Sequence, residues 1–253
     1  MTAVAGIAVL LAGIAAGVIN TVVGSGSLLT FPVLMAVGYS PLVANMSNTV
    51  GLTPGNFSGA WGYRDELRGQ RNRILNYGAI TLAGSIVGAT LLLALPPGAF
   101  TAVVPWLVLL AGLLVLAQPT LRAAMDRHRP DGGTHHLWPL YVGVFCCSVY
   151  GGYFGAAQGI ILLALFGLFL RDDLHRLNAV KNVLTGIANA VAAVIFIAVG
   201  HVAWLPAILL AIGSTIGGQF GAKAAKLLHP SILRACIVVV SFTVFAVMIL
   251  NSY

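Results

Sequence analysis

Ten apolar runs follow one another along this chain, and their lengths limit what it can fold into. Eight of them are 18 to 23 residues long, and a helix of about 20 residues crosses a bilayer core of about 30 Å. The eight runs cover residues 3–23, 42–62, 74–95, 99–118, 138–155, 178–200, 203–222 and 231–250. The sequence therefore predicts an all-α polytopic membrane protein.

The composition excludes a soluble globular domain. Hydrophobic residues make up 59% of the chain, charged residues make up 8%, and the mean hydropathy is +0.97, whereas soluble domains are roughly 45–50% apolar and 25% charged. The three cysteines match neither a disulfide framework nor a zinc-binding spacing. No nucleotide-binding loop or nucleophile triad occurs, so we expect no enzyme activity, no cofactor, no bound metal and no nucleic-acid partner.

Two apolar runs are too short to cross a bilayer, and small residues precede each of them. GSGSLLTFP occupies residues 24–32, AAQGIILLA occupies residues 156–164, and the runs that follow the breaks end near residues 39 and 170. About a dozen helical residues reach roughly 20 Å, which suits half-helices or re-entrant segments. The sequence predicts two helical hairpins, at 1–39 and 138–170, each broken near its middle.

Such breaks mark a candidate binding site. Backbone groups that are exposed inside a membrane are tolerated only where protein or a water-filled cavity satisfies them, and the amino terminus of a half-helix favours anions. The candidate ligands at the breaks are Ser25, Gly26, Ser27, Gln158 and Gly159. Two alternatives remain: the small residues serve close helix packing, and the Ser and Gln side chains cap the half-helices.

The basic residues predict the orientation. All thirteen lie in or beside four segments, which the positive-inside rule places in the cytoplasm. They are Arg64, Arg68, Arg71 and Arg73; Arg122, Arg127 and Arg129; Arg171, Arg176 and Lys181; and Lys223, Lys226 and Arg234. The links at 96–98 and 200–203, and both termini, are then external. We expect anionic lipid headgroups to be partners of the basic loops.

The two halves resemble each other and run in opposite directions. AGSIVGA at 83–89 recurs as IGSTIGG at 212–218, and Asn48 and Asn56 are echoed by Asn182 and Asn189. The predicted architecture is therefore a pair of inverted-topology repeats, as in secondary transporters. Residues 1–119 form the first repeat, 120–137 a cytoplasmic basic loop and 138–253 the second repeat. Each repeat is a broken helical hairpin followed by three transmembrane helices.

The helix after each hairpin carries a polar stripe. Asn45, Asn48 and Asn56 lie on the earlier helix, and Asn178, Lys181, Asn182 and Asn189 lie on the later one. We expect the two stripes to face each other and to offer donors to an oxyanion, although such residues also join helices within a bundle. Lys181 either snorkels to the cytoplasmic interface or attracts an anion at the inner mouth.

The hairpins and the helices after them resemble a known family. GVINTVVGSGSLLTFPVL and SPLVANMSNTVGL, with their degenerate copies YGGYFGAAQGIILLALF and LNAVKNVLTGIANAVAAVIF, are similar to segments of the TauE/SafE sulfite exporter family. The resemblance covers nearly the whole chain. It implies a bacterial inner-membrane permease of seven or eight spans that moves small sulfur-containing or organic anions such as sulfite and sulfonates.

Taken together, these features favour a secondary transporter of small anions. The six acidic residues all lie in the predicted cytoplasmic loops, so no carboxylate relay crosses the membrane. An anion that leaves a negative cell interior gains roughly 2.3 kcal/mol per charge per 100 mV, which favours export of sulfite or organosulfonate-type anions. The alternatives are an anion channel and a permease that takes up another small organic anion or sulfur compound. The sequence predicts no oligomeric state.

Overall fold

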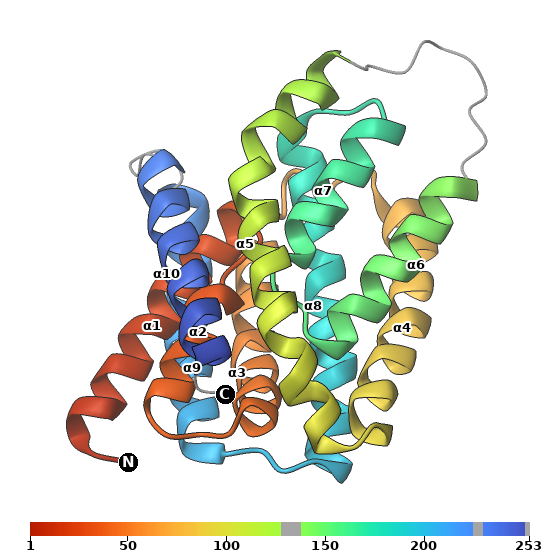
Figure 1. Ribbon diagram of the computed structural model, residues 1–253. Coiled ribbons are helices and arrows are strands. Elements are labelled where there is room, and N and C mark those ends of the chain that lie inside the picture. The colour runs from red at the N-terminus through yellow and green to blue at the C-terminus, as the bar shows by residue number, and fades with distance from the viewer. Residues whose placement is uncertain (128–137, 225–229, 251–253) are drawn as a thin grey trace.

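The computed structural model describes residues 1–127, 138–224 and 230–250, and within these ranges it is all-helical (Figure 1). Ten helices follow one another along the described chain. They are α1 (Ala3–Val22), α2 (Ser27–Ala36), α3 (Pro41–Gly62), α4 (Arg71–Ala94), α5 (Pro97–Arg127), α6 (Trp138–Tyr153), α7 (Gln158–Phe169), α8 (Leu174–Val199), α9 (Trp204–Ala224) and α10 (Pro230–Leu250).

Five of the described helices are long and apolar enough to cross a membrane, fewer than the eight long runs of the sequence suggested. They are α1, α4, α5, α8 and α9. Helix α3 has 22 residues, but its Asn, Ser, Thr and Gly residues dilute its apolar character. Helix α6 has only 16 residues, and α2 and α7 have 10 and 12, as expected of half-helices. The chain is therefore a multi-pass membrane protein.

Local sequence signals fix several helix ends. The Thr2 side chain accepts a hydrogen bond from the backbone of Ala5 at the start of α1, and Asp173 accepts one from His175 at the start of α8. Both are typical N-cap interactions. Pro41 occupies the first position of α3, where its missing N–H costs nothing.

Helix α5 is longer than the apolar run that predicts it. The run ends at residue 118, but the helix continues to Arg127 because residues 120–127 (TLRAAMDR) contain mostly strong helix formers. The first eight residues of the expected 120–137 loop are therefore helical. Residues 128–137 lie outside the described part of the chain.

Helices α3 and α8 occupy the centre of the bundle and pack against each other. Helix α1 packs along α9, which also packs on α3, while α6 packs along α4, which also packs on α8. Helices α5 and α10 pack together beside the two short helices (Figure 1). The polar stripes predicted on α3 and α8 are thus held inside the molecule.

Glycines let the backbones of two helix pairs approach closely. A Cβ built on Gly213 of α9 would lie 2.5 Å from the carbonyl oxygen of Leu10 in α1, and one on Gly84 of α4 would lie 2.7 Å from that of Phe145 in α6. Gly217 and Gly88, one turn further along, pack still closer, against the carbonyls of Ile14 and Val149. Small residues at such contacts are the usual basis of helix association in membranes.

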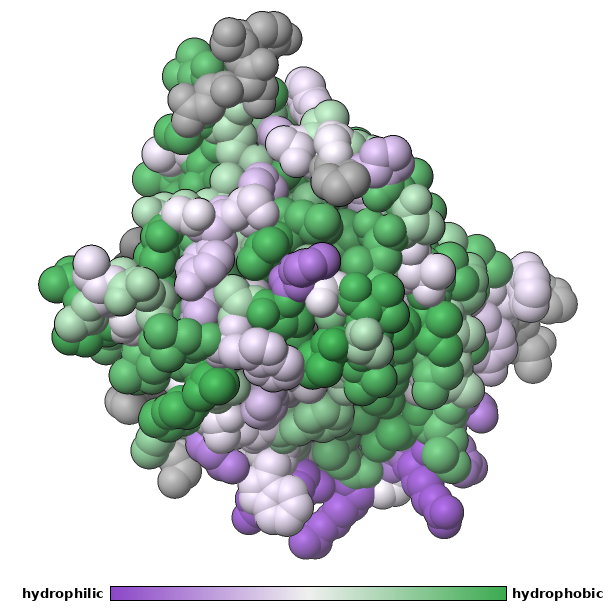
Figure 2. Space-filling view, turned by 90° about the horizontal axis from the view of Figure 1, so that it is seen from below, coloured by the Kyte–Doolittle hydropathy of each residue, from purple (hydrophilic) through white to green (hydrophobic). Residues whose placement is uncertain are grey.

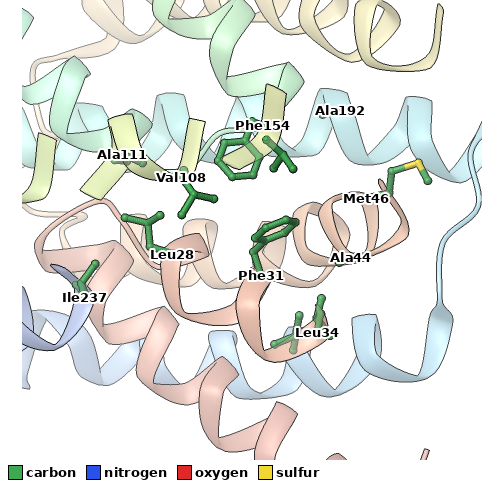
Figure 3. Close-up of a cluster of buried hydrophobic side chains, with 14 of the residues drawn as sticks. Leu28, Phe31, Leu34, Ala44, Met46, Val108, Ala111, Phe154, Ala192 and Ile237 are labelled. Atoms are coloured by element: carbon green, nitrogen blue, oxygen red, sulfur yellow. The ribbon is translucent and has the colours of Figure 1, made fainter. Parts of the chain in front are cut away.

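The short helix α2 sits in an apolar cluster. Leu28, Phe31 and Leu34 of α2 are almost fully buried among side chains of α3, α5, α8 and α10 (Figure 3). Phe31 meets the ring of Phe154, at the second break, edge to face at 5.4 Å between ring centroids. This contact joins the two hairpins through their apolar side chains.

The links between helices separate to two ends of the molecule. The α2–α3, α4–α5 and α8–α9 links lie at the lower end in Figure 1, together with the amino terminus. Seen from that end, strongly hydrophilic residues are few and gather mainly along one margin (Figure 2). The α3–α4 and α7–α8 links, which carry the arginines, meet at the other end, where Gln70 donates a hydrogen bond of 3.1 Å to the Arg176 carbonyl.

Replacing Gly217 or Gly88 by alanine should separate a helix pair. The new methyl would collide with a backbone carbonyl that cannot move alone, so we expect a loss of about 1–3 kcal/mol in the free energy of unfolding. Thermal unfolding in detergent measures this loss. Gly98→Ala is the matched control, because its Cβ would meet nothing within 4 Å; equal stabilities for all three variants would contradict the packing.

Candidate functional site at the two helix breaks

Both predicted breaks are present, and left-handed backbone conformations produce them. Gly24 has a φ of 88° between α1 and α2, and Gly155 has a φ of 76° between α6 and α7. Ala157, beside the second break, also has a left-handed backbone conformation, with a φ of 61°; among the described residues it is the only non-glycine residue that does. A left-handed residue ends a helix, so the chain turns back at each of these points.

The tips of the two hairpins touch. A Cβ built on Gly24 would lie 2.7 Å from the Cα of Gly159, which is the second residue of α7. The same construction on Gly159 would place its Cβ 3.1 Å from the Cδ of Lys181. The structure therefore brings together the two breaks and the one lysine of the α8 stripe, although these lie up to 157 residues apart in the sequence.

The stripe of α8 binds the carboxyl-terminal end of α1. Lys181 Nζ donates to the carbonyls of Asn20 at 3.1 Å and Thr21 at 3.5 Å. The amides of Asn178 and Asn182 also donate to the Thr21 carbonyl, at 3.2 and 3.4 Å. The final carbonyls of a helix have no intrahelical partner, so these side chains supply the donors that the break removes.

The stripe of α3 contacts both hairpins. Asn45 Nδ2 donates to the carbonyl of Tyr153, the last residue of α6, at 3.0 Å. Asn48 accepts a hydrogen bond from Thr30 of α2, and Asn56 accepts one from Asn20 of α1. The side-chain hydrogen bonds found for these three α3 residues run to the hairpins, while α3 itself packs against α8. That the two stripes face each other stays a prediction.

Lys181 is fully buried, with 0% of its surface exposed. This argues against the snorkelling alternative, because its ammonium group lies at the end of α1 and does not reach the surface of the molecule. A buried charge is costly unless it is hydrogen-bonded. The carbonyls of Asn20 and Thr21 provide this solvation, and the negative end of the α1 dipole favours a cation at the same place.

Several buried polar atoms near the breaks have no hydrogen-bond partner in the described part of the chain. They are Ser25 Oγ, Gln158 Nε2, Asn56 Nδ2, Asn45 Oδ1 and Asn178 Oδ1. Neither α2 nor α7 has a side-chain cap at its amino terminus, where the N-cap residues are Gly26 and Ala157. The capping alternative for Ser25, Ser27 and Gln158 therefore finds no support. Buried donors and acceptors without a partner are features that suit a ligand.

The remaining candidate residues lie close to the same region. Gly26 donates its N–H to Asn20 Oδ1 at 3.3 Å, and Ser27 is the first residue of α2. Asn189, which is 9% exposed, places its Oδ1 3.7 Å from a Cβ built on Gly155. The α8 stripe thus runs from the first break, at Asn178, to the second break, at Asn189.

Two polar residues of the site escaped the sequence analysis. Asn20 bonds both Asn56 and the N–H of Gly26, and Thr30 bonds Asn48. Each is a polar residue within an apolar run, four to six residues from a break glycine. One helical turn separates residues that share a face, so this spacing was the signal that could have identified them.

An ion cluster holds the arginine-bearing α3–α4 and α7–α8 links together. Asp172, in the α7–α8 link, pairs with Arg73 of α4 and with Arg176 of α8, the latter at 2.9 Å. Burial alone would raise the pKa of Asp172, but the hydrogen bond and charge of Arg73, with Arg176 beside it, hold that pKa below its ordinary value. The cluster connects the end of α7 to α4.

The comparisons with known proteins agree with this architecture. Residues 9–248 match the family described as sulfite exporter TauE/SafE. A protein of Escherichia coli K12 named "Probable membrane transporter protein YfcA" is 29% identical over 239 residues, which cover 94% of this chain and 87% of that protein. No solved structure matches the chain at a significant level.

More distant relatives carry similar names. A "Probable membrane transporter protein" of Haemophilus influenzae is 27% identical over 95% of this chain and 92% of its own length. "Probable membrane transporter protein ORF9" of a Sinorhizobium species is 25% identical over 89% of this chain and 85% of its own length. The molecule is thus a membrane transporter. The chain belongs to the sulfite exporter TauE/SafE family.

Asp172→Asn should reduce stability in a pH-dependent manner. A carboxyl group whose pKa is lowered by folding stabilises the protein above its ordinary pKa of 3.8, and this contribution is lost as the pH falls through the lowered pKa. We therefore expect the variant to unfold at a lower temperature than the native protein at neutral pH, with the difference shrinking in acid. Asp65→Asn removes an exposed ion pair and serves as control; a constant difference across pH would refute the assignment.

Proposed function

We propose that this chain is a secondary transporter that exports small anions of the sulfite or organosulfonate type across the bacterial inner membrane. The observation that carries the proposal is the buried ammonium group of Lys181 beside the contact between Gly24, in the first break, and Gly159, at the start of α7. One full positive charge and two partial positive charges at membrane depth form an anion site. The names of the family and of its relatives support a transport role.

The polar side chains divide into two groups in this site. Ser25 Oγ, Gln158 Nε2 and Asn56 Nδ2 are buried without partners in the described chain, so they can bond substrate oxygens directly, together with the backbone at Ser27 and Gly159. Gly26 lies beside them, but its N–H is already held by Asn20 Oδ1. The amides of Asn45, Asn178 and Asn182 already hold the ends of α1 and α6. The second group therefore positions the breaks, and Asn48 and Asn189 extend it to α2 and to Gly155.

The packing supports an inverted repeat. If the first five helices are exchanged for the last five, the α1–α9 contact becomes the α6–α4 contact and α2–α10 becomes α7–α5. The contacts α3–α8 and α5–α10 map onto themselves. The glycine contacts obey the same exchange, with Gly213 and Gly217 matching Gly84 and Gly88. Two hairpins that enter from opposite sides would allow alternating access to one central site.

The membrane potential supplies the driving force for export. An anion leaving a negative interior gains roughly 2.3 kcal/mol per charge per 100 mV. The acidic side chains that the structure describes, Asp65, Glu66, Asp172 and Asp173, lie in the links between helices. Without a carboxylate at membrane depth among them, transport through a carboxylate proton relay finds no support.

Lys181→Gln should weaken transport while leaving a hydrogen-bonding side chain in place. A hydrogen bond to a charged group contributes about 1.5–3 kcal/mol, so we expect the half-saturating anion concentration to rise about 10- to 100-fold. The assay is electrogenic flux in proteoliposomes under an imposed potential, with sulfite, thiosulfate, sulfoacetate, taurine and lactate as test solutes.

Two further variants make that result specific. Arg71→Gln removes an exposed positive charge at the start of α4 and should leave the flux unchanged, and Lys181→Arg, which keeps the charge, should retain measurable flux. Equal flux in native protein and Lys181→Gln would refute the role of the lysine. No flux of any test anion in the native protein would refute the proposed substrate class, and flux without saturation or counterflow would favour a channel.

The proposed orientation predicts opposite labelling of two cysteine variants. Ser40 in the α2–α3 link and Arg71 at the start of α4 are both exposed, and the positive-inside rule puts Ser40 outside the cell and Arg71 inside. In a cysteine-free background, a membrane-impermeant maleimide added to intact cells should label Ser40→Cys and spare Arg71→Cys. Labelling of both from outside, or of Arg71→Cys alone, would overturn the orientation and the external termini.

A further inference from the structure

The two breaks share the same backbone geometry but differ in charge. The N–H of Gly24 bonds the carbonyl of Ile19 at 3.1 Å, and the N–H of Gly155 bonds that of Tyr150 at 3.0 Å. In each case the glycine N–H does not bond the carbonyl four residues before it, as it would in a regular helix. That carbonyl belongs to Asn20 in α1 and to Gly151 in α6. Each break thus leaves an equivalent carbonyl without its helical donor.

Only the first of these equivalent carbonyls receives a cation from the described chain. The Asn20 carbonyl accepts a hydrogen bond from Lys181 Nζ at 3.1 Å. Among the described residues, no donor to the Gly151 carbonyl is found. A buried carbonyl at the negative end of a helix dipole favours a positive charge or a donor.

The positions on α3 and α8 explain why the lysine is present at one break alone. Asn45 and Asn178 are each the fifth residue of their helix, and each donates to a terminal carbonyl of a hairpin, at 3.0 and 3.2 Å. Three residues further along, α8 has Lys181 and α3 has Asn48. At the helix position equivalent to Lys181, α3 therefore carries a neutral residue.

Two acceptor oxygens lie close to the backbone of the second break, and a third belongs to Asn45, which bonds the end of α6. The Gly151 carbonyl and Asn189 Oδ1 lie 2.9 and 3.7 Å from the point where a Cβ on Gly155 would sit. Asn45 Oδ1 is buried, with 1% of the residue exposed, and has no partner in the described chain. The orientation of this amide is fixed, because its Nδ2 donates to the Tyr153 carbonyl.

We propose that the end of α6 binds a sodium ion, at the position equivalent to that of the Lys181 ammonium group at the end of α1. The proposed ligands are the Gly151 carbonyl and the side-chain oxygens of Asn45 and Asn189. They are hard, neutral oxygen ligands, which suit a small monovalent cation, whereas Ca²⁺ and Mg²⁺ sites use carboxylates. Carbonyls at the ends of broken helices are the sodium ligands of other transporters with broken helices.

The sodium ion would complete the charge balance of the anion site. This role for sodium rests on the proposed function. A substrate anion between the tips of the hairpins would then meet two cations: Lys181 at the first break and sodium at the second. Such a pair favours doubly charged oxyanions over singly charged ones. The binding of sodium itself requires no substrate, so it can be measured alone.

The test compares the thermal unfolding of purified protein in NaCl, KCl and choline chloride at equal ionic strength, without any sulfur anion. A ligand that binds the native state alone raises the unfolding temperature, and we expect sodium at about 100 times its Kd to raise it by about 5 °C over choline. Asn189→Ala should lose this shift, because it removes a ligand oxygen for which no hydrogen bond is found. Asn76→Ala, an exposed position on α4, should keep the shift.

A variant that adds a lysine at the second break tests whether a fixed cation replaces sodium. Asn48→Lys places a tethered ammonium group at the position equivalent to Lys181, so its unfolding temperature should no longer respond to sodium. The proposal is overturned if native protein unfolds at the same temperature in sodium and choline, or if Asn189→Ala keeps the full shift. If sodium raises the unfolding temperature but the protein transports none of the test anions, the cation site is supported and the substrate class is rejected. If the protein transports a test anion but sodium does not raise its unfolding temperature, the substrate class is supported and the cation site is rejected.

Discussion

A helix that ends inside a membrane must find partners for the carbonyls and amides that it no longer pairs with itself. The rest of this structure depends on how that demand is met at the two breaks. The amides of Asn45 and Asn178 hold the ends of α6 and α1, and the Lys181 ammonium group shares the end of α1. The polar stripes thus stabilise the breaks, and the buried groups without a partner in the described chain are the ones proposed to bind the ligand.

Close packing of backbones positions the tips that these side chains stabilise. Glycines let α1 lie directly on α9 and α6 directly on α4, which fixes the angle at which each hairpin enters the bundle. The tips then meet at Gly24 and Gly159, where neither residue has room for a side chain. A methyl group added in either interface would therefore displace the hairpin tips, although α9 and α4 contribute no candidate ligand. Small residues therefore serve close helix packing at some positions of this chain and form the two breaks at others.

The sequence identified the broken hairpins and the polar stripes because both depend on local patterns: small residues within an apolar run, and Asn at helical spacing. It failed where the answer depends on distant partners. Lys181 lies five residues from Arg176 and so suggested a shallow position, but its burial follows from the approach of α1, some 160 residues away. Asn20 looked like an isolated polar residue until Asn56 and Gly26 were placed beside it. Helix α5 continues beyond the apolar run that ends at residue 118, because the residues that follow this run have high helix propensity although they are not apolar.

A single charge separates two otherwise matching halves. Helices α3 and α8 present Asn at the same fifth position and use it in the same way, yet lysine follows in one and asparagine in the other. A lysine in both halves would bring two buried ammonium groups close to touching tips, and their repulsion would be weakly screened at membrane depth. Neutral residues in both halves would leave the anion with partial helix charges alone. In the proposed mechanism, one fixed charge therefore attracts the anion, while the neutral break holds a cation that is free to leave.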